Sequence, residues 1–357
     1  MSKLKQITRM RLFLPIFSMA LVLMTNMIFD VVNGNAIFNF FTISIRNGIL
    51  YGRIIDVLNR GSEAAILAIG MTLVVSASAG ADISVGSVMS LAGGMCCMIL
   101  AGFGNANVSE YANPLWMGML AGLAVACLCG AFNGLLVSYL NIQPMVATLI
   151  LFSAGRAIGL LLCNSTIVYI REPSFQFLGG YCWILPTPIL VAGGCILIMS
   201  LILKFTALGM YVQSVGINPN AARIAGYQSR RIIFTTFVIS GLCAGIAGLV
   251  ATSRIYSADT NNIGLNLELD AILAVALGGN SLGGGKFRLS GSIIGAYTIQ
   301  AITTTLYALG ISSAQAPVFK AVIVILSVTI QAPAVKAYLQ KRAAAKLAAS
   351  TKEAIGT

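Results

Sequence analysis

The chain has 357 residues, of which 58% are hydrophobic and only 9% are charged, and its formal net charge is +12. Soluble domains carry about 25% charged residues, so this composition excludes a soluble globular protein and predicts an integral membrane protein. The sequence contains no histidine, which excludes histidine-based catalysis and histidine metal ligands. The eight cysteines have neither metal-ligand nor disulfide-framework spacing, so they are expected to be apolar fillers, and no cofactor or metal is expected.

Hydrophobic runs divide the chain into about ten candidate membrane spans. A helix of about 20 residues crosses the hydrocarbon core. We therefore expect an all-α fold, a polytopic integral membrane helical bundle over residues 1–335, followed by a basic cytoplasmic tail over 336–357. The first run lacks a small-residue cleavage site and is interpreted as a signal anchor. The expected spans are 12–30, 60–79, 84–103, 114–138, 142–163, 184–204, 230–254, 268–283, 289–309 and 316–334.

The basic residues lie mainly on one side of this ten-span arrangement. Most of the 22 Lys and Arg residues precede the first span, lie within residues 204–231, or follow the eighth and last spans. The positive-inside rule then places both termini in the cytoplasm, although Arg46, Arg53 and Arg60 in the first outer loop oppose it. Because the charge follows membrane topology, the expected environment is membrane lipid, and no nucleic acid partner is expected.

A polar segment over 76–87 separates the second and third spans and places Asp82 and Ser84 near membrane depth. Carboxylates inside a membrane are costly and mark transport pathways or pairing sites. Alternatively, Asp82 or Ser84 caps the third span by accepting hydrogen bonds from its first amide groups, such as those of Val85 or Gly86. Both interpretations of Asp82 are open at this point.

Three polar side chains belong to the fourth and fifth spans. Asn133 and Gln143 lie near the inner ends of these spans, where hydrogen bonding between helices is the expected role. Arg156 lies about 22 Å from Asn141 at helical rise, in the outer half of the fifth span. It is expected to form a structural salt bridge or to snorkel toward the membrane interface, or alternatively to line the cavity. The longest outer connections, 31–59 and 164–183, are rich in aromatic residues and can form a lid or a landing surface.

A polar interruption over 214–231 contains a short helix with its own capping residues. Asn218 can cap the first amide groups, Pro219 occupies the first helical position, and Gly226 can end the helix. On the basic side of a membrane protein, such a helix predicts a docking element, with Ala221, Ala222 and Ile224 entering a groove of a partner. The candidate docking residues are Asn218, Pro219, Asn220, Ala221, Ala222, Arg223, Ile224, Ala225 and Gly226.

The eighth span, 268–283, is short and ends in a glycine cluster, so it is expected to be broken or re-entrant. The run 278–288 fails as a phosphate loop, because Asn280 stands five before Gly285 and Phe287 follows Lys286. If the protein takes part in transport that consumes ATP, the ATPase would therefore be a separate polypeptide. Asn280 and Ser281 complete the candidate pathway residues. The segments 65–69 and 271–275 are similar, which reflects either a duplicated half or chance.

Several motifs between roughly residues 60 and 330 together carry a resemblance to a known protein family. They include Ala81-Asp-Ile-Ser-Val-Gly-Ser87, Gln143-Pro-Met-Val-Ala-Thr-Leu149 with Arg156, Val215-Gly-Ile-Asn218, Ser240-Gly-Leu-Cys-Ala-Gly-Ile-Ala-Gly248 and Leu267-Glu-Leu-Asp-Ala-Ile-Leu-Ala274. The chain resembles the sugar-type permeases of bacterial ABC importers, the ribose/xylose/galactoside group. Asp259-Thr-Asn-Asn262 and Leu185-Pro-Thr-Pro188 look most like the galactofuranose-type permeases. Gly80-Ala-Asp-Ile83 and Asn280 depart from the family pattern and leave the sugar open.

The resemblance implies a non-enzymatic transport subunit in the bacterial inner membrane. Residues 218–226 would be the coupling helix that docks on a separate ABC ATPase subunit. A second permease subunit, identical or paralogous, would complete the pore, and a periplasmic sugar-binding protein would deliver galactofuranose or a related monosaccharide. Two alternatives are an ion-coupled secondary sugar carrier, with Asp82 and Arg156 as coupling groups, and a passive channel or scaffold subunit.

Overall fold

The computed structural model describes residues 13–32, 39–46 and 48–331. The expected basic tail, 336–357, and the basic residues before the first span lie outside these ranges. The chain divides into two compact units, Met1–Thr304 and Thr305–Thr357, and each is described by itself. In unit 2, the described residues are the last turn of α12, the connection 309–315 and helix α13. The exposed apolar side chains of α13 include Val318, Phe319 and Val322.

Helices make up nearly all of the regular structure in the described residues, and each of the ten expected spans overlaps one of them. The predicted all-α membrane bundle is therefore confirmed. Among the described residues, five helices (α3, α5, α6, α7 and α10) are long and apolar enough to cross a membrane. The helices are α2 Phe13–Val32, α3 Arg53–Ser78, α4 Val85–Ala101, α5 Leu115–Ser138, α6 Pro144–Leu162, α7 Thr187–Phe205, α8 Leu208–Ile217, α9 Pro219–Ile224, α10 Ser229–Ile255, α11 Leu267–Leu277, α12 Leu289–Ala308 and α13 Ala316–Gln331.

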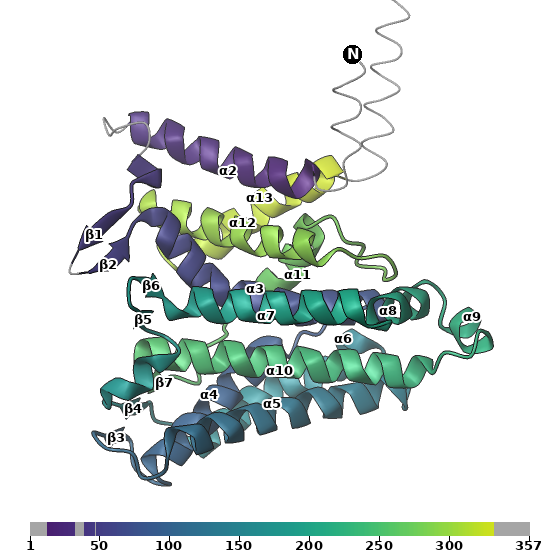
Figure 1. The fold of residues 1–357 in the computed structure, drawn as a ribbon, viewed down its shortest axis with the longest axis horizontal. Helices are drawn as coiled ribbons and strands as arrows, with labels where there is room; N and C mark the ends of the chain where they lie inside the picture. Colours follow the sequence, from purple (N-terminus) through teal and green to yellow (C-terminus); the bar gives the residue numbers. More distant parts are fainter. Residues whose placement is uncertain (1–12, 33–38, 47, 332–357) are drawn as a thin grey trace, which may run out of the picture. The chain divides into compact units, whose positions relative to one another are not determined.

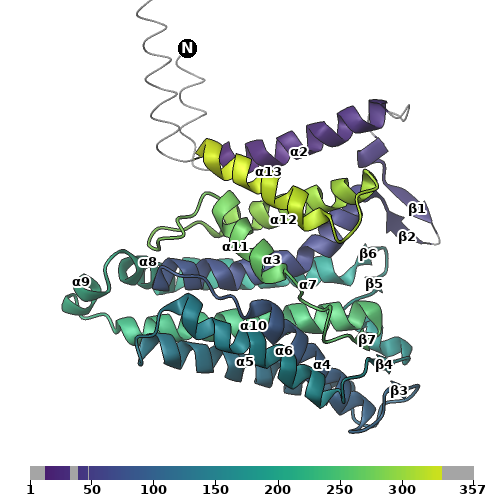
Figure 2. The same cartoon turned by 180° about the vertical axis from the view of Figure 1, so that it is seen from behind.

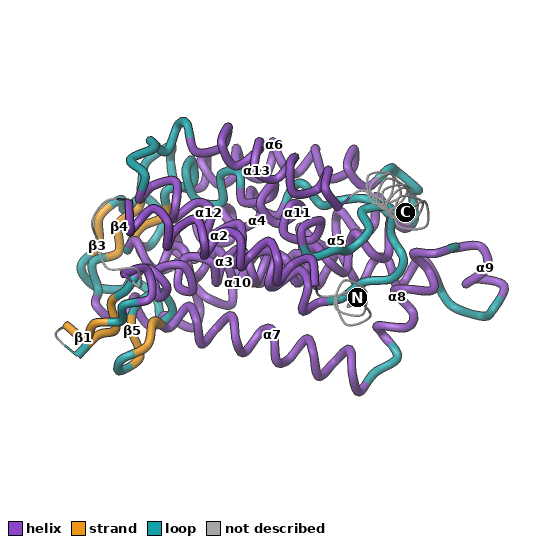
Figure 3. The backbone as a smooth tube through the Cα atoms, turned by 90° about the horizontal axis from the view of Figure 1, so that it is seen from above, coloured by secondary structure: helices purple, strands orange, loops and turns teal. Residues whose placement is uncertain are grey.

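Unit 1 has two distinct ends (Figures 1 and 3). Short strands gather at one end, and α9 projects from the other. A three-stranded sheet at the strand end joins β3 (Asn107–Val108), β4 (Val168–Ile170) and β7 (Ser257–Ala258), with β4 parallel to β3 and antiparallel to β7. Two antiparallel hairpins lie at the same end: β1 (Ser44–Arg46) with β2 (Ile49–Tyr51), and β5 (Tyr181–Cys182) with β6 (Leu185–Pro186). Two 3-10 turns, Asn39–Phe41 and Pro173–Phe177, complete the long connections.

The core of unit 1 is built around α3, α4, α5 and α10, which pack against one another (Figure 2). Glycine allows these backbones to approach closely. A Cβ atom on Gly241 of α10 would lie 2.4 Å from the carbonyl oxygen of Ala126 on α5, and one on Gly130 would lie 2.5 Å from that of Phe237. Small residues at four-residue spacing therefore pack helices together here, as such pairs do in other membrane proteins.

The contact between α4 and α10 gives a stability prediction. A Cβ atom on Gly248 would lie 2.2 Å from the carbonyl oxygen of Met89, so Gly248→Ala must push the two helices apart. Overpacking of this kind costs about 1–3 kcal/mol. We expect a lower thermal unfolding midpoint for this variant in detergent. Gly193→Ala on α7 is the matched control, because nothing lies within 4 Å of its added Cβ; equal midpoints for the two variants would contradict the packing account.

Candidate functional site

The break between α3 and α4 places Asp82 inside the helix bundle. Helix α3 ends at Ser78, Ala79 adopts a left-handed backbone conformation with φ of 53°, and α4 begins at Val85. The Asp82 side chain is buried. Its Oδ1 accepts hydrogen bonds from the backbone N of Ser84 (3.0 Å) and from Ser84 Oγ (2.7 Å), and its Oδ2 accepts one from Ser240 Oγ of α10 (3.0 Å).

These contacts replace the simple helix cap that was one expectation for Asp82. Ser84 occupies the N-cap position of α4, but no side-chain capping bond is formed there. Instead, Ser84 Oγ accepts a hydrogen bond from Asn133 Nδ2 of α5 at 2.8 Å, and Thr148 Oγ1 of α6 accepts one from the backbone N of Ile83 at 3.1 Å. The predicted bonds to the Val85 or Gly86 amides are therefore wrong, because the short loop directs the carboxylate toward Ser84 and α10.

Three of the predicted site residues thus come together in what we call the Asp82 network, defined as Asp82, Ser84, Asn133 and Ser240. Ser240 is the member that sequence reasoning left out of the site. It lies in the Ser-Gly motif that opens residues 240–248, and that motif was used only for the family resemblance. The network joins the α3–α4 break to α5 and α10, so it fixes the shape of the break.

A second interrupted helix meets the first in the interior. Residues 259–266 lead into α11, which has 11 residues, and this confirms the expectation of a short span. A Cβ atom on Gly264 would lie 2.2 Å from the carbonyl oxygen of Gly86, and one on Gly86 would lie 2.1 Å from Glu268 Oε2. The N-terminal ends of α4 and α11 therefore touch. From this junction α4 runs toward the strand end and α11 toward the α9 end (Figure 1).

The junction has the electrostatic properties of paired helix N-termini. Each helix presents unpaired backbone N–H groups and a partial positive charge at its start. Glu268 is buried beside these groups, and its Oε2 atom has no hydrogen-bond partner among the described atoms. In transporters, interrupted helices whose N-termini meet near the membrane midplane line the substrate path.

Arg156 fastens the segment that leads into α11. Its Nη1 atom donates to the backbone carbonyls of Thr260 (2.9 Å), Asn261 (2.7 Å) and Ile263 (3.2 Å). Within the described ranges the ion pairs are Arg53–Asp30 and Arg254–Glu63, so the structural ion pair suggested for Arg156 is not formed. In the same ranges, no group of three or more Cys, Asp or Glu residues is arranged to hold a metal ion.

These three carbonyl bonds predict the effect of removing the guanidinium. Arg156→Leu should loosen residues 259–266 and abolish uptake while the protein still assembles. Hydrogen bonds to charged groups contribute about 1.5–3 kcal/mol each, so amide protection in this segment should fall by about 10-fold or more. Hydrogen–deuterium exchange of the purified protein measures this, with Arg156→Lys as the charge-retaining comparison. Unchanged protection and unchanged uptake in the leucine variant would reduce Arg156 to an anchoring charge.

The other predicted pathway residues lie at the α9 end and make no described hydrogen bond with the Asp82 network. Gln143 is exposed at the start of α6 and lines a cavity of about 450 Å³. Asn280 closes the connection between α11 and α12: its side chain bonds the backbone N and O of Arg288 and Ser292 Oγ. Ser281 is exposed and accepts a bond from the backbone N of Gly283. The side chain of Asn280 therefore stabilises the connection between α11 and α12.

The short helix α9 has the caps that its sequence predicts. Asn218 Oδ1 accepts hydrogen bonds from the backbone N atoms of Asn220 and Ala221, both at 3.0 Å, Pro219 is the first helical residue, and Gly226 follows the helix with φ of +89°. Its exposed face differs from the expectation. Ala222 is only 4% exposed, because it packs against the protein itself, whereas Ile224 is 90% exposed. Ala221 is exposed as expected, and Ile224 is the large apolar residue that α9 presents outward.

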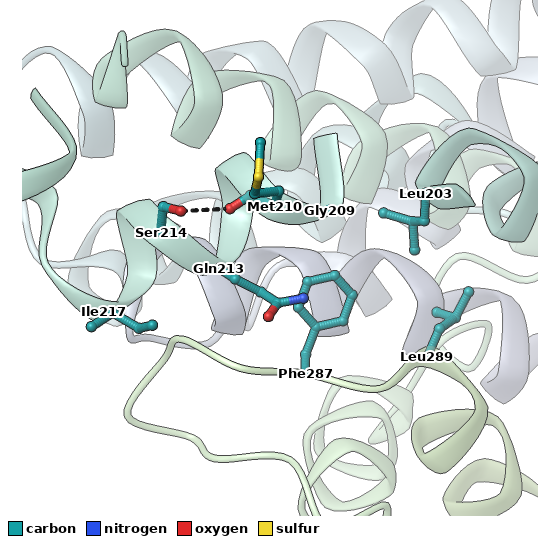
Figure 4. Close-up of a pocket in the computed structure, with 8 residues that line it drawn as sticks. All are labelled: Leu203, Gly209, Met210, Gln213, Ser214, Ile217, Phe287 and Leu289. Carbon is teal, nitrogen blue, oxygen red and sulfur yellow. Dashed lines mark hydrogen bonds between the residues drawn. The ribbon is translucent and has the colours of Figure 1, made fainter. Parts of the chain in front are cut away.

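A second cavity at the α9 end, of about 480 Å³, lies beside α8 (Figure 4). Its wall combines the apolar side chains of Leu203, Met210 and Phe287 with the polar side chain of Gln213, which lies beside the Phe287 ring. Helix α8 forms part of this wall, and within it Ser214 Oγ donates a hydrogen bond to the backbone carbonyl of Met210 at 2.8 Å. Ile217, at the end of α8, lines both cavities, so both adjoin the base of α9.

A polytopic helical bundle with two interrupted helices and a projecting capped helix defines the class as a membrane transport permease. Residues 53–329 match the family described as branched-chain amino acid transport system / permease component, and the chain belongs to this family. Its members are permease components, so the chain is a transport subunit rather than an enzyme, as predicted.

Three curated relatives give finer comparisons. The chain is 43% identical to the galactofuranose transporter permease protein YtfT of Escherichia coli (strain K12), covering 82% of this chain and 83% of the relative. It is 38% identical to the fructose import permease protein FruF of Bifidobacterium longum (strain NCC 2705), covering 80% and 79%. It is 34% identical to the ribose import permease protein RbsC of Escherichia coli (strain K12), covering 82% and 87%. The predicted resemblance to sugar-import permeases is confirmed.

Proposed function

We propose that this chain is the transmembrane permease subunit of an ATP-driven importer in the bacterial inner membrane, and that it forms the translocation pathway for a monosaccharide. The observation that carries the proposal is the meeting of the α4 and α11 N-termini at Gly86 and Gly264. Such a junction supplies backbone donors in the interior of the bundle. The pathway would pass this junction, with the Asp82 network as one rigid wall.

The relatives favour a sugar over the amino acids that the family description mentions. They are import permeases for galactofuranose, fructose and ribose, and the 43% identity to the galactofuranose permease makes that sugar or a related one the first candidate. Asp82 is bonded to serine donors and Arg156 to backbone carbonyls, so both side chains hold the protein's own structure.

The two ends of unit 1 suit different partners. At the α9 end, the capped helix with exposed Ile224 fits the groove of a separate ABC ATPase, so this end would be cytoplasmic, together with both termini. At the strand end, exposed aromatic side chains such as Trp183 and Phe177 offer a landing surface for a periplasmic sugar-binding protein. A second permease subunit, identical or paralogous, would complete the pore.

Uptake by proteoliposomes that contain the permease with its ATPase and binding protein tests the substrate. Radiolabelled D-galactose, D-fructose, D-ribose and L-leucine would be supplied separately, with ATP inside the vesicles. We expect ATP-dependent accumulation of at least one sugar and none of leucine. Accumulation of leucine without any of the sugars would show that the family description, rather than the three relatives, gives the correct substrate class.

A further inference from the structure

A cavity of about 240 Å³ at the strand end of unit 1 carries an inference beyond the pathway itself. Polar side chains from three parts of the chain share its wall: Glu63 of α3, Arg254 in the last turn of α10, and Asp259 and Asn262 of the segment before α11. Met89 and Leu267 contribute an apolar wall. We propose that this cavity is the outer binding subsite for a neutral, polyhydroxylated ligand, a proposal that rests on the proposed function.

Two of the three charged side chains of the cavity form an ion pair with each other. Arg254 Nη2 forms an ion pair with Glu63 Oε1, and a buried pair of this kind is much less costly than either charge alone. Asp259 Oδ1 accepts from the backbone N atoms of Asn261 and Asn262, and its Oδ2 accepts from Asn262 Nδ2 at 2.7 Å. An amino acid zwitterion needs a free cation for its carboxylate and a free anion for its ammonium group. The cavity offers no free cation, because Arg254 is paired with Glu63 and Asp259 adds a further negative charge. It therefore disfavours the carboxylate of an amino acid and favours a ligand without one.

Hydrogen-bonding capacity is still available on the polar wall. An arginine side chain carries five N–H donors, and the hydrogen bond described for Arg254 uses only its Nη2 atom, toward Glu63. Its Nε atom is enclosed by the protein, so the Nη groups are the donors on the cavity wall. Asn262 uses its amide N–H for Asp259, which leaves its carbonyl oxygen as an acceptor. A sugar presents hydroxyl groups that both donate and accept, together with an apolar C–H face. The hydroxyl groups would contact Arg254 and Asn262, and the C–H face would lie against Met89 and Leu267.

The position of the cavity connects it to the interior junction. Gly264 lines the cavity and also touches Gly86 at the start of α4. The segment between Asp259 and Gly264 therefore forms the cavity wall on one side and is fastened by Arg156 on the other. A ligand held between Glu63–Arg254 and Asn262 would lie at the outer entrance to the α4–α11 junction. Arg254 would thus be a specificity-determining residue.

Saturation-transfer difference NMR on the full-length permease in lipid nanodiscs tests the subsite without ATPase or binding protein. The probes are D-galactose, D-fructose, D-ribose and L-leucine, each at up to about 50 mM, a range suited to weak small-ligand binding. We expect transfer to at least one sugar and none to leucine. Arg254→Lys keeps a cation for Glu63 but removes the guanidinium with its remaining N–H donors, so it should reduce the sugar signal by about 10-fold. Asn262→Ala should have a similar effect.

The other described ion pair of unit 1 provides the matched control. Arg53→Lys makes the same substitution opposite Asp30, away from the cavity lining, and should leave sugar binding unchanged. An undiminished sugar signal in Arg254→Lys with a wild-type unfolding midpoint would overturn the subsite, as would a signal from leucine alone or from none of the probes. Sugar binding that depends on Arg254, combined with no ATP-driven uptake by the assembled importer, would instead overturn the proposed function and leave the subsite standing.

Discussion

Replacing Ile224 by arginine is expected to reduce ATP-coupled uptake by about 100-fold while the permease still folds and inserts. Ile224 is 90% exposed on α9, so the substitution disturbs no internal packing. Burying one isoleucine against a partner contributes about 1.5–3 kcal/mol, and an unpaired charge in the same groove removes that contribution. Co-purification of the ATPase and uptake by proteoliposomes measure the two consequences together.

The control for Ile224→Arg places the same change on the opposite end of unit 1. Ile45 of β1 is 65% exposed, and Ile45→Arg should leave ATPase co-purification intact. Ala222→Arg, the substitution that the sequence alone suggests, is a poorer test, because Ala222 is buried against the protein and the variant would disrupt α9 itself. Full substrate-stimulated ATP hydrolysis in Ile224→Arg would show that α9 is not the docking element.

Asp82→Leu is expected to abolish transport and lower stability, whereas Asp82→Asn should be nearly silent. The asparagine carbonyl can accept the bonds from Ser84, and its amide N–H can donate to Ser240 Oγ, so the Asp82 network persists without charge. Leucine leaves the Ser84 N–H and two hydroxyl groups without this acceptor in the buried site, at about 1–3 kcal/mol for each unsatisfied group.

Uptake of labelled sugar and the unfolding midpoints of the two Asp82 variants give the measurement. A charge-dependent role, such as proton coupling in a secondary carrier, predicts instead that Asn and Leu both abolish transport at similar stability. Loss of uptake in Asp82→Asn, with a wild-type unfolding midpoint, would therefore favour the carrier. It would contradict the proposal that Asp82 holds the break between α3 and α4 in shape through hydrogen bonds.

Local patterns predicted most of the helices and the details of α9. Hydrophobic runs located each span because membrane helices must bury apolar side chains over a fixed length. Asn218, Pro219 and Gly226 defined α9 because caps depend on neighbouring residues alone. The same reasoning failed for Ala222, since which face of a six-residue helix turns inward is decided by contacts with the rest of the chain.

The site residues were predicted less well, because their partners are distant in sequence. Asp82 and Ser240 are 158 residues apart, and Arg156 and Thr260 are 104 apart. Spacing along one span shows that Arg156 lies inside the membrane but not that it bonds carbonyls. The pair Glu63 and Arg254 was missed for a similar reason. Each lies toward the outer end of its helix, where a single charge in the sequence resembles an ordinary surface residue.

The energy source of transport tests the central proposal most directly. Proteoliposomes that contain the permease, its ATPase and the binding protein would be loaded with ATP or with a non-hydrolysable analogue, and sugar uptake would be followed with and without a protonophore. The proposed function predicts uptake that requires hydrolysable ATP and is unchanged by the protonophore. Uptake that persists with the analogue and collapses when the protonophore is added would contradict it and identify an ion-coupled carrier.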